Sequence, residues 1–174
     1  MSIIQLLPLN DAGFNFTPYD AKSTFALDPM YISLDALILT DRRSWADDIK
    51  ALKRRFPTGR ERVDYGIKKE KLGLLSRIYE GEAEARNRRL EAFIGANGFW
   101  LKDYALFNVL KNRNGQSSWE DWEAALKERD PEALKGLEAE EADEISFTIW
   151  LQWQMYEQFV SVKSYARQKG VFLM

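Results

Sequence analysis

The feature that most constrains this chain is a long run of apolar side chains at helical spacing near its C-terminus. The run extends from about residue 138 to residue 169, and one line along it holds Ile145, Ile149, Trp153, Tyr156 and Val160. A second line beside the first holds Phe147, Trp150, Leu151, Met155, Phe159 and Val162. So wide an apolar arc predicts a helix covered on two sides, because each large side chain gains roughly 1.5–3 kcal/mol on burial. Gly170 ends this helix, and the apolar segment 171–174 after it predicts a buried strand, so the two together indicate an α/β unit.

The N-terminal third combines a short apolar run with an aromatic loop. A short apolar run with β-branched members, made of Ile3, Ile4, Leu6 and Leu7, precedes Pro8 and a polar turn, a pattern typical of a buried strand. The next residues repeat at neither a helical nor a strand period, yet they carry Phe14, Phe16 and Tyr19. A loop with aromatic side chains and few charges often shapes a binding site. The alternative is a loop that packs its two phenylalanines into the core.

Composition excludes several classes of function. The chain has 174 residues and a formal net charge of -2, so it offers no electrostatic reason to bind nucleic acid or an anionic membrane. It contains no cysteine and no histidine, which removes disulfides, thiolate and Ser-His-Asp catalysis, and the usual zinc or haem ligands. Carboxylates remain as the acid/base groups. With no apolar run near the ~18 residues of a membrane span, we expect a cytoplasmic protein with no cofactor and no metal site.

The middle of the chain predicts several helices separated by polar turns. We expect one helix that begins after the N-cap Ser44 and ends at Phe56, and a second that begins after Tyr65, with Asp64 as a candidate cap. A third helix is expected from Trp100 to Lys111 and should be buried. Two shorter helices are expected after the caps Ser118 and Asp130. Residues 30–34 alternate weakly and predict a short strand or an extended arm. The fold class is therefore mainly α with a few short β strands.

Three blocks of sequence resemble the 4-alpha-glucanotransferases, also called amylomaltases or disproportionating enzymes. The first block comprises Leu7-Pro8-Leu9, Gly13, Thr17-Pro18-Tyr19, Ser23, Ala26, Asp28-Pro29 and Ile32. The second is Val63-Asp64-Tyr65 before a lysine-rich helix start, and the third, the most specific, is the segment 100–107, WLKDYALF. Trp119, Trp122, Gln152 and Gly170 continue the resemblance, which covers essentially the whole chain.

The resemblance implies an internal piece of a larger enzyme. In that family an aspartate nucleophile, a glutamate acid/base and a second essential aspartate follow the part that this chain matches, so we expect no catalytic residue here. Such an enzyme would move α-1,4-glucan segments (maltooligosaccharides) between chains by a retaining double displacement. The resemblance places Tyr19 against the sugar beside the scissile bond, on a loop whose entry Pro18 fixes. It places Phe14 where relatives carry an aromatic of a remote glucan site, and we expect Asp28 to cap or brace the loop.

The resemblance also implies a division of the chain into a partial β/α barrel and an inserted helical subdomain. Residues 1–40 would supply a barrel strand and the sugar-facing loop, residues 41–138 the inserted subdomain, and residues 139–174 a barrel helix and a truncated strand. The strands 3–7 and 171–174 would then expose unpaired edges and favour self-association. The alternative function is a non-catalytic helical module that binds glucan or another protein.

Overall fold

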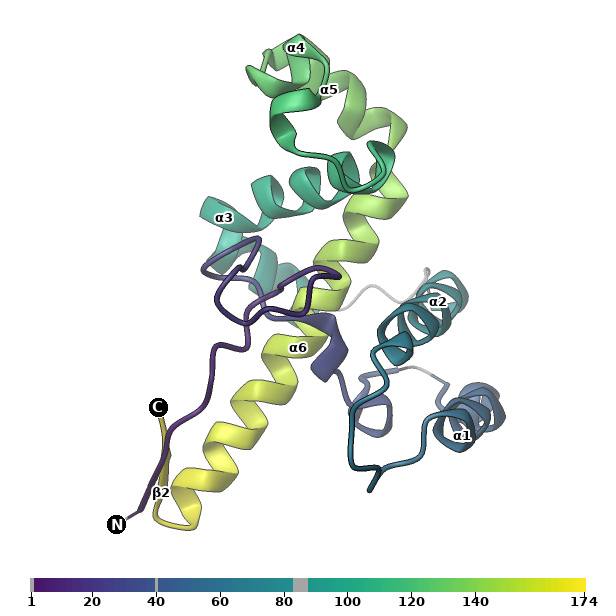
Figure 1. Cartoon of the computed structure of the whole chain (residues 1–174), viewed down its shortest axis with the longest axis vertical. Coiled ribbons are helices and arrows are strands. Elements are labelled where there is room, and N and C mark those ends of the chain that lie inside the picture. The colour runs from purple at the N-terminus through teal and green to yellow at the C-terminus, as the bar shows by residue number, and fades with distance from the viewer. Residues whose placement is uncertain (1, 40, 83–87) are drawn as a thin grey trace. The chain divides into compact units, whose positions relative to one another are not determined.

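The computed structural model describes residues 2–39, 41–82 and 88–174 and is mainly helical (Figure 1). Its α-helices are α1 (Ala46–Arg55), α2 (Gly66–Gly81), α3 (Arg88–Arg113), α4 (Ala124–Lys127), α5 (Pro131–Glu140) and α6 (Ala142–Gln168). Its 3-10 helices are η1 (Pro29–Tyr31), η2 (Leu34–Ala36), η3 (Arg43–Trp45) and η4 (Trp119–Asp121), and its strands are β1 (Ser2–Ile4) and β2 (Val171–Leu173). The predicted fold class, mainly α with a few short strands, is confirmed. None of the helices in the described residues carries an apolar stretch of the length that a bilayer requires.

The two strands lie side by side although 166 residues separate them in the sequence. β1 pairs with β2 in parallel, with Ile3 opposite Phe172, and Figure 1 shows the two ends of the chain together. Beyond the strands, Leu6 N–H donates to the Met174 carbonyl over 2.7 Å. The apolar runs predicted as strands therefore do pair, but the prediction that these strands are buried is wrong, because all three residues of β1 and Phe172 of β2 are exposed. Each strand keeps one edge that no other described strand covers.

α6 begins later than the periodicity predicts and is enclosed only in its middle. Glu141, with φ -112°, ends α5, so the single helix expected from residue 138 is two helices. Asp130 caps α5, as expected, by accepting from two backbone N–H groups. At the other end Gly170 has φ +70°, the left-handed conformation expected of a residue that terminates a helix. Trp150, Leu151, Trp153 and Met155 of α6 are buried, whereas Tyr156, Val160 and Val162 are exposed.

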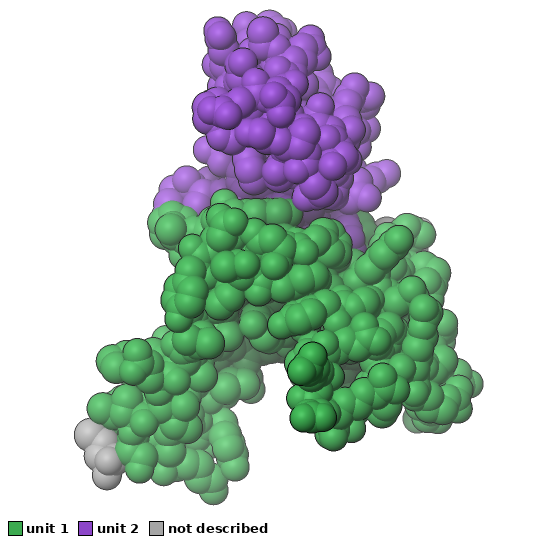
Figure 2. Space-filling model, viewed as in Figure 1, with its two compact units in different colours: residues 1–88, 152–174 green, residues 89–151 purple. Residues whose placement is uncertain are grey.

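Packing divides the chain into two compact units, coloured separately in Figure 2. Unit 1 comprises residues 1–88 and 152–174, and unit 2 comprises residues 89–151. The core of unit 2 contains Leu106, Val109, Leu110, Trp122 and Leu137, which agrees with the prediction of a buried helix around residues 100–111. The division into packing units does not test the predicted boundaries between the barrel parts and the inserted subdomain at residues 40 and 138, so these boundaries stay predictions. Residues 40 and 83–87 of those expected segments lie outside the described residues.

Two local predictions in unit 1 are wrong. Residues 30–34 form neither a strand nor an extended arm, because Pro29 and the capping carboxylate of Asp28 begin the 3-10 helix η1. Ser44 does not cap the helix α1. Its hydroxyl instead donates to Asp41, which also accepts from the Arg43 N–H. These hydrogen bonds lower the pKa of Asp41, the one to Ser44 contributing most.

Candidate functional site

Tyr19 lies at the tip of a tight turn and points into solvent. Asp20 N–H donates to the Thr17 carbonyl over 3.0 Å, which closes a four-residue turn with Pro18 and Tyr19 at its centre. Proline presets the backbone angle that the second position of such a turn needs. Tyr19 is 76% exposed and Pro18 is partly buried. The structure therefore presents the predicted tyrosine on the surface and not in the core.

The side chain of Asn15 stabilises this turn by hydrogen bonds. Its side-chain Nδ2 donates to Asp20 over 2.7 Å, and its Oδ1 accepts from Thr17 N–H over 2.9 Å. One amide therefore bonds both ends of the four-residue turn. Such a local network restricts the backbone that carries Tyr19 and lowers the entropy lost when a ligand binds.

Backbone hydrogen bonds close the base of the loop. Asp11, at the start of the loop, bonds to residues 22–26 at its end. The Asp11 N–H donates to the Ala26 carbonyl over 3.0 Å, and the Asp11 carbonyl accepts from the Lys22 N–H over 2.7 Å. Gly13 has φ +63°, the left-handed conformation that glycine adopts without strain, so the backbone at this position favours glycine. The aromatic segment is thus a closed loop, and we call the residues that close it, Asp11, Lys22 and Ala26, the neck of the loop.

A buried lysine of α2 fastens the neck of this loop. Lys68 is 2% exposed, and its Nζ lies 3.2 Å from Asp11 Oδ1 and 2.9 Å from Asp28 Oδ2. It also donates to the Gly13 carbonyl. Both carboxylates are buried and accept backbone hydrogen bonds, Asp11 from Gly13 and Asp28 from Ala12 and Met30. The expectation that Asp28 caps and braces the loop is confirmed.

The phenylalanines of the loop gather around the same lysine. Lys68 Nζ lies 5.3 Å from the ring centroid of Phe14 and 5.7 Å from that of Phe16, within the range of cation–π attraction. Phe16 stacks on Tyr65 at 4.3 Å, whereas Phe14 is 48% exposed. Phe14, the predicted second-site residue, therefore presents part of its ring to solvent on the side of the loop fixed by Lys68.

A second lysine of α2 bonds the residues that follow the loop. Lys71 donates to the carbonyls of Met30 and Ile32, at 2.6 and 3.1 Å. Burial lowers the pKa of Lys71, and the negative charge of Asp28 opposes that shift. Two lysines of one helix thus attach to successive parts of the segment 11–32.

Three glutamines of α6 hold the same N-terminal segment from another side. Each side-chain amide both donates to the carbonyl and accepts from the N–H of one residue, pairing Gln152 with Leu27, Gln158 with Ser33 and Gln154 with Ile38. Gln152 and Gln154 are 3% and 0% exposed. These amides do what a neighbouring strand would do for an extended chain, and we call them the glutamine clasps.

The sequence did not reveal Lys68 or the clasps as parts of the site. One signal was present, because Lys68 precedes Leu75 by seven residues and so lies on the inward stripe of α2. A lysine on an apolar stripe requires buried acceptors. The pairing partners of the glutamines, more than a hundred residues away, leave no such trace.

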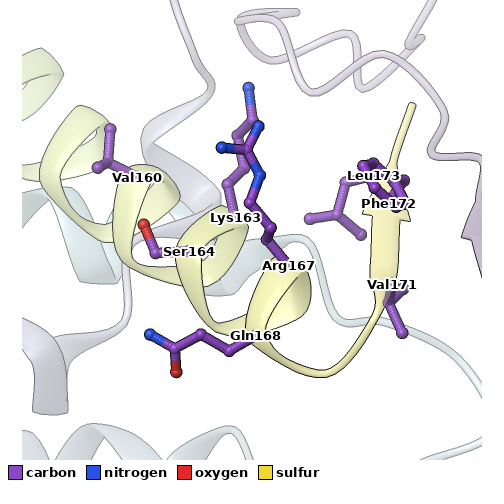
Figure 3. A pocket seen from close by; sticks show the side chains of 8 residues that line it. All are labelled: Val160, Lys163, Ser164, Arg167, Gln168, Val171, Phe172 and Leu173. Carbon is purple, nitrogen blue, oxygen red and sulfur yellow. The ribbon is translucent and has the colours of Figure 1, made fainter.

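A cavity of about 630 Å³ opens between the last turns of α6 and the strand β2. Figure 3 shows its lining, with the side chains of Lys163 and Arg167 extending from the same side of the helix. Val160 and Phe172 add exposed apolar surface. Within the described parts of the chain, no cluster of acidic side chains could hold a metal ion.

Comparison with known proteins places the whole chain in one family. The family model described as 4-alpha-glucanotransferase matches residues 1–174. The 4-alpha-glucanotransferase of Thermus thermophilus is 32% identical over 172 residues, covering 96% of this chain and 33% of the relative. That of Clostridium butyricum is 29% identical over 168 residues, covering 96% of this chain and 34% of the relative.

Solved structures agree on the fold. Amylomaltase from Streptococcus agalactiae, solved in complex with acarbose, matches with a TM-score of 0.83 and 24% identity, covering 99% of this chain and 35% of that one. The chain thus spans about a third of the length of the curated relatives it matches. The resemblance seen in the sequence is confirmed, and the chain belongs to the 4-alpha-glucanotransferase family.

Proposed function

We propose that this chain is the segment of a 4-alpha-glucanotransferase that forms part of the wall around the donor sugar. The observation that carries the proposal is the position of Tyr19, 76% exposed at the tip of a braced turn, in a chain that matches the family over its whole length. A tyrosine ring can pack on the C–H face of a pyranose while its hydroxyl bonds to the sugar. The likeness to a structure that holds acarbose supports a role in binding such ligands.

The proposed reaction moves an α-1,4-glucan segment to the 4-hydroxyl of another glucan chain with retention of configuration. A carboxylate attacks the anomeric carbon while a second carboxyl group, about 5–5.5 Å away, protonates the leaving oxygen. The acceptor hydroxyl then displaces the enzyme carboxylate after giving its proton to the second group. Asp11 and Asp28 are ill suited to these roles, because Lys68 and backbone N–H groups occupy their oxygens.

We assign the roles within the chain by position. Tyr19 contacts the donor sugar, Pro18 shapes the turn that presents it, and Phe14 offers a stacking face for a second glucan contact. In the same proposal residues 1–40 and 139–174 belong to a β/α barrel and residues 41–138 to an inserted helical subdomain. The parallel pairing of β1 with β2, with the helix α6 directly before β2, supports the barrel assignment.

Two further proposals concern the surroundings of the chain. Self-association of copies through the strand edges is supported by the exposure of Ile3, Leu7 and Phe172. We also propose a cytoplasmic location, which the lack of cysteine supports, and a part in starch or glycogen metabolism, which the proposed reaction supports.

A graft tests the proposal without depending on where this chain begins or ends. Residues 1–174 replace the matching third of the Thermus thermophilus relative, and the hybrid is assayed for release of glucose from maltotriose. We expect disproportionation by the hybrid and none by the 174-residue chain alone. A hybrid that unfolds cooperatively and yet leaves maltotriose unchanged would contradict the proposal.

A further inference from the structure

Unit 2 contains an aromatic pocket that the proposed donor-sugar wall does not use. Its volume is about 310 Å³, near the lower end of the range for small-molecule sites. Phe107, Trp119 and Trp122 contribute its aromatic surface, and the charged side chains of Asp103, Lys127 and Arg129 also line it. All residues that line the pocket lie between positions 103 and 134, so the pocket lies wholly within unit 2.

The aromatic lining combines a fixed wall with an open platform. Trp122 is 7% exposed and packs against Phe107, with 5.4 Å between ring centroids. Trp119 begins the 3-10 helix η4, which Ser118 caps as the sequence predicts, and it is 53% exposed. Because both tryptophans line the pocket, the half-exposed indole of Trp119 offers a flat apolar face to a ligand.

Polar groups accompany the apolar surface. Asp103 accepts from Arg129 over 2.7 Å, and both side chains are more than half exposed, so their remaining donors and acceptors are open to solvent. Lys127 donates to the Glu120 carbonyl over 3.1 Å, which ties α4 to η4. The buried indole N–H of Trp122 has no hydrogen-bond acceptor among the described residues. Such a buried donor calls for an explanation, and a polar ligand or water is a common one.

We propose that this pocket binds one glucosyl residue of an α-1,4-glucan, apart from the Tyr19 site. A pyranose has an apolar C–H face and a rim of hydroxyls, so it can stack on Trp119 while Asp103 and Arg129 bond to its hydroxyls. An apolar side chain of a partner protein would leave the charged groups of the lining without a role. The choice of a glucan rests on the proposed function, in which an α-1,4-glucan is the substrate.

The indole N–H signals of the chain provide the test. Each of the six tryptophans carries one indole N–H group that contributes a signal to a ¹H–¹⁵N spectrum, and the variant Trp119→Phe identifies the signal of Trp119 as the one that is lost. The chain is titrated with maltoheptaose. We expect the Trp119 signal to shift and saturate, and we expect the shift to be unchanged in Tyr19→Ala.

Substitutions then assign the binding. Trp119→Ala removes the platform and should weaken maltoheptaose binding at this site about 3–10-fold, read from the remaining pocket signal of Trp122. Phe99→Ala is the matched control, because Phe99 is 73% exposed in the same unit and does not line the pocket. It should bind as the unaltered chain does.

The outcomes separate this inference from the proposed function. A Trp119 signal that stays unmoved by millimolar maltoheptaose overturns the inference, even if the grafted hybrid is active. A signal that moves on dilution of the protein but not with sugar also overturns it, since the occupant is then another copy of the chain. Saturable shifts in Trp119 with an inactive hybrid support the pocket and contradict the proposed function alone.

Discussion

Lys68 is the residue on which the geometry of the candidate site depends most. Its ammonium group lies between two buried carboxylates, and removing one partner of such a group leaves uncompensated buried charge. We expect Lys68→Met to lower the free energy of unfolding by about 3–5 kcal/mol, measured by urea denaturation. Asp11→Asn and Asp28→Asn, added to Lys68→Met, should recover much of the loss, because no unpaired charge remains.

The neighbouring Lys69 supplies the control for this prediction. Lys69 is exposed on the next position of the same helix, so Lys69→Met should change stability by less than about 0.5 kcal/mol. If both substitutions lower the free energy of unfolding by the same amount, the ion pairs of Lys68 with Asp11 and Asp28 do not hold the loop.

Local chemistry determined how well individual residues were predicted. The cap at Asp130 and the stop at Gly170 each depend on a few adjacent residues, and the structure has them as expected. Ser44 was assigned wrongly as a cap because Asp41, three residues earlier, offers the stronger acceptor. The role of Lys68 depends on two aspartates 40 and 57 residues away, which no local pattern reveals.

At the scale of elements, α6 organises the fold through its glutamine clasps. A buried amide that bonds both backbone groups of one residue is costly to remove, because each orphaned group costs about 1–3 kcal/mol. We expect Gln152→Leu to lower the free energy of unfolding by about 2 kcal/mol or more and to speed hydrogen exchange at the Leu27 amide.

Gln158 provides a matched comparison on the same helix. It makes the same pair of bonds to Ser33, but these lie at the surface, where water can replace them. Gln158→Leu should therefore cost less than about 1 kcal/mol. If the two leucine variants are equally stable, burial of the clasp is not what makes it important.

Element types were easier to predict than element ends. The apolar side chains at helical spacing were enough to predict that α6 exists. The break at Glu141 depends on the backbone conformation of one residue, which this spacing does not encode. The segment 29–38 forms 3-10 turns and not a strand, because distant glutamines and not a sheet satisfy its backbone.

At the scale of the whole molecule, exposed strand edges predict association between copies. Ile3 of β1 is 63% exposed, and the variant Ile3→Lys places a charge on that edge, a change that discourages edge pairing. We expect the unaltered chain to sediment faster at micromolar concentration than after dilution, and Ile3→Lys to remain a monomer. Val63→Lys, at another exposed apolar position, should associate as the unaltered chain does. A concentration-independent monomer for all three would refute the prediction.

In the proposed function, Tyr19 contacts the sugar that is transferred. The most direct test is the kcat/KM of the grafted hybrid for maltotriose, compared between the hybrid and its variants Tyr19→Ala and Tyr31→Ala. Tyr31 is a control because it is also more than half exposed but lies outside the turn. We expect a loss of about tenfold or more for Tyr19→Ala and little change for Tyr31→Ala. Equal kcat/KM values for the hybrid and its Tyr19→Ala variant would contradict the proposed contact between Tyr19 and the sugar.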